Sequence, residues 1–487
     1  MTRPPHIRAT ALVAAVLFVA LGTPAFAATP TGPSAWQPPP VNMGMLTTLP
    51  AENAKGTPDG AFTRDNNKQC IASGVGNVPL VDRPPAQDML AIDQAQQFAT
   101  GKNVTVAEID TGVNPHPFLR TNNRLVNGGD YILGDGNALQ DCDGHGTIVA
   151  GIVGGDTRGS GLAFTGVAPD AKILAIKHTS QLYTTQDANG TRSAGDLMTL
   201  AEAIVYAADR PDVKVITMSV DNCMPAGGDQ LASAAAMQLQ AAIHYAVNTK
   251  DKVVIAAAGN LTANSDSTDQ NGQSPCQNVP QNTNPNPNQV NQIEVPPVYA
   301  DDVVSVASVD PTTGAPSPFT VWGPWVTIAA PGQGITSVDP GQGGTGLSNR
   351  TVDNGKPVEM QGTSFAAPYV AGVVALVRSH FPTLSARQVM TRIEATAQHP
   401  SGPGGRNNQV GYGIIDPVAA LTAVIPGQNG VPAAGNTGIP AVLPMAAVKD
   451  WTPMRVAVIG TVVGIALLLG TLFVVRTVRH NRVRRDA

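Results

Sequence analysis

The run Val104-Thr-Val-Ala-Glu-Ile109 is short and mainly apolar, and Asp110-Thr111-Gly112 follows it directly. Similar apolar runs lie further along the chain, at 172–177, 213–218, 253–257 and 303–306. Runs of this kind are typical of buried parallel strands. Helical stretches such as 194–208 and 230–247 lie between them. Strands that alternate with helices predict an α/β domain with a mostly parallel sheet flanked by helices.

Asp110 stands where the first predicted strand ends. In an open α/β sheet, the carboxyl ends of the strands border the crevice that holds the active site. Asp-Thr-Gly is also a motif of aspartic proteases, which need two facing carboxylates that share a proton. The chain contains no second Asp-Thr-Gly, and this disfavours that class. On this motif alone, a structural aspartate in a turn stays an alternative.

His145 lies in Asp143-Gly-His-Gly-Thr-Ile-Val-Ala-Gly151. Glycines on both sides expose the imidazole, and the small residues that follow let a helix pack closely against its neighbours. A lone histidine is often structural or simply exposed. A histidine between glycines at the start of a helix instead indicates a positioned general base.

Ser364 lies in Gln361-Gly-Thr-Ser-Phe-Ala-Ala-Pro-Tyr-Val-Ala-Gly372, which opens an apolar helical stretch that runs to Arg378. Serine is common at a helix N-terminus as a capping residue without any catalytic role. The unpaired N–H groups and the positive dipole end of a helix also stabilise an oxyanion beside a nucleophile. Pro368 falls early in the helix, where its missing N–H costs little.

Taken together, the three motifs supply the groups that acyl transfer needs. Ser364 is the candidate nucleophile, His145 the base that takes its proton, and Asp110 the carboxylate that orients the base. Their order along the chain is Asp, His, Ser, which is the subtilisin order and differs from those of chymotrypsin and the α/β-hydrolases.

Residues from about 100 to 424 resemble a subtilase (peptidase S8) catalytic domain. The family's three blocks are matched by Ile-Asp-Thr-Gly, His-Gly-Thr-x-Val-Ala-Gly and Gly-Thr-Ser-x-Ala-x-Pro. Further similar stretches are Gly166-Val-Ala-Pro169, Ala256-Ala-Ala-Gly-Asn260, Ala330-Pro-Gly332 and Gly411-Tyr-Gly413. The resemblance implies a subtilisin-like fold and serine endopeptidase activity, with Asp110, His145 and Ser364 as the catalytic triad.

The resemblance also implies two further functional elements. Asn260 matches the oxyanion asparagine of the family, although a plain turn residue after Gly259 is the alternative. The substrate-pairing edge of the family is commonly Ser-Leu-Gly-Gly, whereas this chain has Ser219-Val220-Asp221-Asn222. The difference leaves catalysis intact and puts broad specificity in doubt. No cofactor is expected, no Cys/His spacing suggests zinc, and no acidic loop is clear enough to predict calcium.

Both ends of the chain carry targeting signals. A basic start, an apolar run at 9–21 and Ala25-Phe-Ala27 predict a signal peptide over 1–27. An uncleaved anchor is disfavoured because the run is shorter than the ~20 residues that a bilayer span needs. Residues 456–475 carry no charge and are followed by five arginines. They predict a transmembrane helix at 455–475, a cytoplasmic tail at 476–487 and an extracytoplasmic catalytic domain.

Between these ends, the sequence divides into three parts. Residues 28–90 form a proline-rich extension without the strand and helix pattern of an inhibitory propeptide, which makes zymogen control doubtful. Residues 91–424 form the catalytic domain, in which 261–297 is a long inserted loop rich in Asn, Gln and Pro. Residues 425–454 are a Gly/Pro/Ala linker. The net charge of −5, without a concentrated basic face outside the tail, argues against a nucleic-acid partner.

Four cysteines, at 70, 142, 223 and 276, then lie in an oxidising compartment where disulfides persist. Four cysteines allow three pairings, and the spacing does not choose among them. A disulfide from Cys70 would tie the proline-rich extension to the catalytic domain, so a wrapped extension is favoured over a free one.

The whole architecture resembles the mycosins, membrane-anchored subtilases of type VII (ESX) secretion. This resemblance implies disulfides Cys70–Cys142 and Cys223–Cys276. It also implies exported protein substrates and partners in the secretion membrane complex. A structural role, in which the protein stabilises that complex and proteolysis is secondary, is the alternative function.

Overall fold

The computed structural model describes residues 36–49, 56–74, 76, 80, 82–187, 190–220, 222–226, 230–261, 290, 292–353, 356–428 and 452–483. The predicted signal peptide (1–27) and most residues of the linker (425–454) and of the inserted loop (261–297) lie outside these residues. By its internal contacts the chain divides into two units, residues 1–429 and residues 430–487.

A seven-stranded sheet with every neighbouring pair parallel forms the centre of the first unit, in the order β12-β11-β9-β7-β2-β4-β3. Its strands are β2 Thr105–Asp110, β3 Leu125–Asp130, β4 Lys172–Lys177, β7 Val213–Met218, β9 Val253–Ala257, β11 Val303–Val309 and β12 Ile328–Pro331. All residues of β2, β9, β11 and β12 are buried. The predicted mostly parallel sheet is therefore confirmed.

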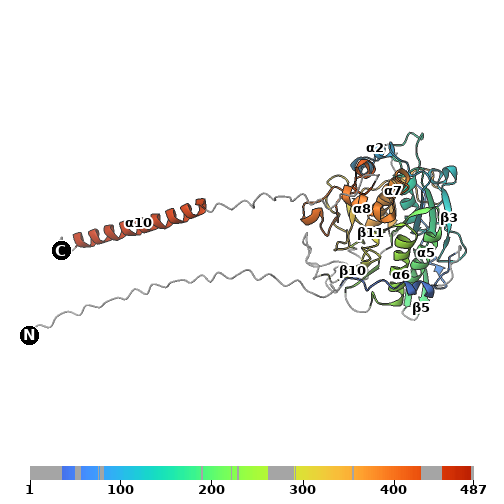
Figure 1. Ribbon diagram of the computed structural model, residues 1–487, viewed down its shortest axis with the longest axis horizontal. Coiled ribbons are helices and arrows are strands. Elements are labelled where there is room, and N and C mark those ends of the chain that lie inside the picture. The colour runs from blue at the N-terminus through green and yellow to red at the C-terminus, as the bar shows by residue number, and fades with distance from the viewer. Residues whose placement is uncertain are drawn as a thin grey trace, which may run out of the picture. The chain divides into compact units, whose positions relative to one another are not determined.

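Helices cover the sheet. The longer ones are α4 His145–Gly154, α5 Leu197–Asp209, α6 Ala234–His244, α7 Thr363–His380 and α8 Ala386–Thr396, and the short ones are α1 Pro85–Met89, α2 Ile92–Gln96, α3 Pro117–Arg120 and α9 Pro417–Thr422. Helix α7 contacts α4 and the strands β7, β9, β11 and β12, and Figure 1 shows it beside β11. Its residues from Thr363 to Arg378 are all buried. A Cβ on Gly372 would lie 2.4 Å from the Val167 Cβ, so glycine lets this central helix approach the chain after α4.

Smaller sheets lie around the central one. Their strands are β1 Thr63–Arg64, β5 Ser180–Asp187, β6 Gly190–Ala194, β8 Asn222–Pro225, β10 Gln292–Val295, β13 Ser337–Val338, β14 Leu347–Ser348, β15 Arg350–Asp353 and β16 Lys356–Glu359. Short 3-10 turns occupy Met43–Thr48, Thr121–Asn123 and Pro403–Gly405, and Tyr245–Thr249 is a single π-helical turn that ends α6.

The five strands predicted from apolar runs are all present, whereas β3 and β12 were not predicted. Strand β3 reads Leu-Val-Asn-Gly-Gly-Asp and β12 reads Ile-Ala-Ala-Pro. Glycine, asparagine and proline are depleted in strands. The pairing of both strands with a buried neighbour in the sheet overrides their weak local preference.

The extension before residue 91 contacts the catalytic unit at several places. Strand β1 pairs with β5 in antiparallel fashion. The Trp36 ring lies 6.1 Å from the Trp325 ring, and the Gln240 Nε2 donates to the Pro39 carbonyl at 2.8 Å. Helix α1 begins at Pro85 and α2 at Ile92, so helical structure begins before the predicted boundary at residue 91.

A disulfide joins Cys70 in the extension to Cys142, three residues before His145. Cys223 is also disulfide-bonded, and Cys276 lies outside the described residues. The Ile71 N–H donates to the Cys142 carbonyl at 2.9 Å beside the Cys70–Cys142 bond. The extension is thus covalently tied to the loop that precedes helix α4.

The second unit contains α10, a helix over Thr452–Val483, where the sequence predicts a transmembrane helix at 455–475. Within the residues that the structure describes, no helix is found to be both long enough and apolar enough to cross a membrane.

The Cys70–Cys142 bond generates a prediction about stability. The two cysteines are 72 residues apart in sequence, and a cross-link that closes such a loop restricts the unfolded chain. Replacing both by serine should lower the free energy of unfolding by about 4 kcal/mol. Denaturant titration of the wild type and the double variant measures the difference. An unchanged free energy of unfolding would show that the bond adds nothing to stability.

Candidate active site

Asp110 is the last residue of β2, and its side chain is almost fully buried. Its Oδ1 accepts a hydrogen bond from the Thr111 N–H at 2.7 Å. Its backbone carbonyl accepts from the His178 N–H at 2.8 Å, which ties the end of β2 to the end of β4. The carboxylate is therefore held rigidly at the carboxyl edge of the sheet.

His145 is the first residue of α4. Gly144 before it has φ +81°, a left-handed conformation that favours glycine, and a Cβ there would lie 2.6 Å from the Ile71 Cγ2. The His145 Nδ1 lies 2.7 Å from the Asp110 Oδ1. This contact connects the start of α4 to the end of β2.

Gly146 allows this contact to form. A Cβ on Gly146 would lie 2.1 Å from the Gly112 carbonyl oxygen and 3.2 Å from the Asp110 Cβ. The backbone in the first turn of α4 therefore packs directly against the backbone of the loop after β2, with no side chain between them. The Gly146 N–H donates to the Thr111 Oγ1 at 2.9 Å across the same gap. A side chain at this position would push the imidazole away from the carboxylate.

Ser364 is the second residue of α7, and its hydroxyl reaches the other ring nitrogen of His145, with Nε2 to Oγ at 2.9 Å. A Cβ on Gly362 would lie 3.0 Å from the same Oγ, so glycine leaves room for the hydroxyl. The Phe365 ring lies 5.1 Å from the imidazole and covers one side of it. The carboxylate, the imidazole and the hydroxyl thus form one continuous chain of contacts.

Asn260 lies beside the N-terminus of α7. Its Oδ1 accepts from the Thr363 N–H at 2.9 Å and from the Thr363 hydroxyl at 3.2 Å. The Thr363 Oγ1 also accepts from the Gly259 N–H at 3.2 Å. These contacts hold the Asn260 amide against Thr363, the residue that precedes Ser364, and fix the plane of the amide.

The profile of the subtilase family matches residues 101–413 of the chain, which is more than half of its length. The chain belongs to the subtilase family. It is accordingly a serine protease, and the family expected from its motifs is confirmed.

Individual relatives are similar over most of the chain. Mycosin-3 of Mycobacterium tuberculosis is 39% identical over 463 residues, which cover 93% of this chain and 95% of the relative. Among solved structures, the serine protease MycP1, described as an essential component of the type VII (ESX-1) secretion system, is 38% identical with a TM-score of 0.66; the match covers 79% of this chain and 99% of MycP1. A chain in the periplasmic assembly from the ESX-5 inner membrane complex is 33% identical with a TM-score of 0.68. The match covers 84% of this chain and 99% of that chain.

The predicted substrate edge of this subtilase follows β7. Ser219 and Val220 are half-buried, and the Ser219 hydroxyl donates to the Ser364 carbonyl at 3.3 Å. This places Ser219 beside the N-terminus of α7. Asp221 lies outside the described residues.

Negative charge surrounds the imidazole. Burial of His145 opposes its charged form, but the charge and the hydrogen bond of Asp110 favour it, and the charges of Asp141 and Asp143 add to the effect. The pKa of His145 is therefore raised above its ordinary value of 6.5. A raised pKa means that the site stabilises the imidazolium, the form that a general base takes after accepting a proton.

Two buried carboxyl groups near Asp110 and His145 were not predicted as functional residues. Burial, followed by the nearby charges of Asp110 and Asp141, raises the pKa of Glu108 on β2 well above its usual 4.5. Among the described residues, no donor or acceptor pairs with either of its carboxyl oxygens. Burial also raises the pKa of Asp141 to about 6. The only sequence signal for Asp141 was its place four residues before His145.

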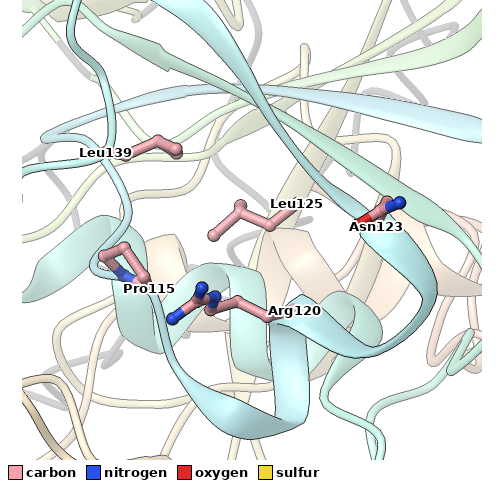
Figure 2. Close-up of a pocket in the computed structure, with 5 residues that line it drawn as sticks. All are labelled: Pro115, Arg120, Asn123, Leu125 and Leu139. Atoms are coloured by element: carbon pink, nitrogen blue, oxygen red, sulfur yellow. The ribbon is translucent and has the colours of Figure 1, made fainter.

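A surface cavity of about 330 Å³ is lined by residues of the segment 115–139, between Asp110 and His145 in the sequence. It is lined by Pro115, Arg120, Asn123, Leu125 and Leu139, and Figure 2 shows these side chains around it. None of the residues predicted for catalysis or substrate pairing lines it. The cavity is therefore separate from the candidate active site.

The raised pKa of His145 generates a prediction about pH. The neutral imidazole is the form that accepts a proton, so activity should fall as the pH drops through the His145 pKa. The acid limb of kcat/KM for a peptide substrate should have its midpoint above pH 6.5, the ordinary value. Unfolding curves over the same pH range serve as the control for loss of structure. A midpoint below 6.5 in the folded protein would contradict the electrostatic account.

Proposed function

We propose that this subtilase is an endopeptidase in which Asp110, His145 and Ser364 act as the catalytic triad. The observation that carries the proposal is the position of the imidazole, with Nδ1 at 2.7 Å from the carboxylate and Nε2 at 2.9 Å from the hydroxyl. The His145 side chain is 29% exposed, so a substrate can reach it. Ser364 opens α7 beside it, where the unpaired N–H groups of a helix start favour negative charge.

In the acylation step, the Ser364 Oγ attacks the carbonyl carbon of the scissile peptide bond. His145 accepts the hydroxyl proton at Nε2 and then donates it to the leaving amine. Asp110 accepts a hydrogen bond from Nδ1–H, which fixes the tautomer and stabilises the imidazolium. In the second step His145 takes a proton from a water molecule, whose oxygen attacks the acyl carbon. The bond from that carbon to the Ser364 Oγ then breaks, His145 returns the proton to Oγ, and the carboxylic acid product leaves.

We also propose Asn260 and the Ser364 backbone N–H as the donors to the oxyanion of the tetrahedral intermediate. Support comes from the Asn260 amide, whose Oδ1 is bound to Thr363. The Nδ2 end of the amide is then the end that a substrate oxygen would meet. Each such donor is worth about 3 kcal/mol of transition-state stabilisation in comparable hydrolases.

We assign substrate pairing to the edge made by Ser219, Val220 and Asp221. An extended peptide that lies against this edge would have its backbone hydrogen-bonded in the manner of an added strand. The proposal is supported by the contact between the Ser219 hydroxyl and the Ser364 carbonyl. The side chain of Asp221 would narrow the range of substrates, since the family commonly has a glycine at that position.

Replacing Ser364 with alanine tests the triad. The variant lacks the nucleophile, so it should lose peptide hydrolysis and labelling by a fluorophosphonate while keeping the fold. Labelling followed by gel analysis, together with circular dichroism, measures both properties. Ser379→Ala is a matched control, because Ser379 lies on the same helix and its hydroxyl donates to the Lys102 carbonyl, away from His145. Undiminished hydrolysis by Ser364→Ala would contradict the assignment.

We infer that the protein works within a type VII secretion membrane complex and cleaves exported proteins there. The support is its similarity to mycosin-3, to MycP1 of the ESX-1 system and to a chain of the ESX-5 periplasmic assembly. The catalytic domain of a protein in such a complex would lie on the extracytoplasmic side, where disulfides such as Cys70–Cys142 persist.

The ends of the chain support a proposal about its attachment. We infer a signal peptide at 1–27, a linker at 425–454, a membrane helix at 455–475 and a cytoplasmic tail at 476–487. The proposal rests on the basic and apolar N-terminus, the uncharged run at 456–475 and the five arginines after it. The same proposal takes 28–90 as an extension that wraps the catalytic domain at 91–424.

A second candidate function is structural. The similarity to a chain that forms part of the ESX-5 periplasmic assembly favours it, because that chain is there a component of a complex. If this protein serves mainly as a scaffold, secretion should continue with Ser364→Ala and stop when the whole protein is deleted. If proteolysis is essential, both strains should fail to secrete. Immunoblots of culture filtrates distinguish the two roles, with the level of the variant protein as the control.

A further inference from the structure

Asp141 is buried, with 3% of its surface exposed, and both of its carboxylate oxygens are hydrogen-bonded. Its Oδ1 accepts from the Thr111 hydroxyl at 2.8 Å and from the Gly144 N–H at 2.7 Å. Its Oδ2 accepts from the N–H of Thr147 at 2.9 Å and from the Thr147 hydroxyl at 2.7 Å. One carboxylate therefore has four donors, two of which are N–H groups at the start of α4.

These contacts join the two segments that carry the imidazole and its carboxylate partner. Thr111 follows Asp110 directly, whereas Gly144 and Thr147 flank His145. Asn114 strengthens the joint, since its Nδ2 donates to the Asp141 carbonyl at 2.7 Å and its Oδ1 accepts from the Asp141 N–H at 3.0 Å. The Asn114 N–H also donates to the Thr147 hydroxyl at 2.9 Å.

We propose that Asp141 is a positioning residue for the reaction, which fixes the His145 imidazole against Asp110 and adds its negative charge to the field that stabilises the imidazolium. This inference rests on the proposed triad. Asp141 itself touches no reacting atom among the contacts described. It acts through the first turn of α4, where its charge also meets the positive end of the helix dipole.

The structure explains why a carboxylate is needed at this position. An amide in the same place would keep one oxygen acceptor and would turn an NH₂ group towards two donors. If the NH₂ group replaced Oδ2, it would face the N–H and the hydroxyl of Thr147. If it replaced Oδ1, it would face the Thr111 hydroxyl and the Gly144 N–H. In either case one buried backbone N–H would lose its acceptor. The first turn of α4 would shift, and a displacement of about 1 Å at a catalytic group reduces a rate by roughly 10²-fold.

The charged groups around Asp141 fix the direction of its electrostatic effect. Asp143 lies in the same loop and acts on Asp141 and His145, and Asp110 and Glu108 lie on β2. Beyond them, Lys177 on β4 acts on Asp143. Asp110, Asp141 and Asp143 all favour the imidazolium, so loss of the Asp141 charge should lower the pKa of His145.

The test is the kinetics of Asp141→Asn with a peptide substrate over a range of pH. We expect kcat to fall about 10- to 100-fold, with little change in KM because Asp141 is buried away from the substrate edge. The acid limb of the profile should move to lower pH, and a merely structural residue would not cause that shift. Asp156→Asn changes the net charge equally and is the control, because Asp156 lies beyond the far end of α4 beside Arg158.

A second variant keeps the inference testable if Asp141→Asn fails to fold. Thr147→Val removes the hydroxyl contact and keeps the charge, so kcat should fall while the acid limb stays in place. A wild-type kcat and an unshifted profile for folded Asp141→Asn would overturn the inference, and so would a Thr147→Val variant with unchanged kcat. Ser364→Ala is assayed alongside. If Ser364→Ala retains activity, the triad itself is wrong; if it is inactive, only the role of Asp141 is rejected.

Discussion

The close approach of α4 to the loop after β2 is the constraint on which the active site depends. No side chain separates the two backbones at Gly146, whose missing Cβ would lie 2.1 Å from the Gly112 carbonyl. This spacing brings His145 to within 2.7 Å of Asp110. Helix α7 then has to deliver Ser364 to the other side of the same ring. It does so because it is buried along most of its length among the strands of the sheet.

The charges of the site follow from this packing. Asp110, Asp141 and Asp143 all favour the protonated imidazole, so in the proposed mechanism the positive charge that develops during proton transfer meets a negative environment that already exists. Such preorganised charge is a major source of catalysis in hydrolases. Burial of so many acidic groups limits how many ionise together, and Glu108 has a pKa raised well above its usual range. The Asp141 charge is retained at neutral pH because four donors surround it.

Much of this arrangement could be predicted from sequence because it depends on local signals. The apolar runs at β2, β4, β7, β9 and β11 gave the sheet, and three short motifs placed the candidate triad at strand and helix ends. Strands β3 and β12 lack such runs, and their structure depends on neighbours distant in sequence. Asp141 was missed for the same reason, because its partner Thr111 lies 30 residues away. The β5–β6 hairpin was also missed, because its polar residues show no buried face.

The central claim is that Asp110, His145 and Ser364 act as one catalytic unit. A crystal structure of the protein after reaction with a fluorophosphonate tests it most directly. The account predicts a phosphonyl group on the Ser364 Oγ, His145 hydrogen-bonded to Asp110, and a phosphonyl oxygen that accepts from the Asn260 Nδ2 and the Ser364 N–H. An adduct on another residue, or an imidazole that has no contact with Asp110 in the modified protein, would contradict it.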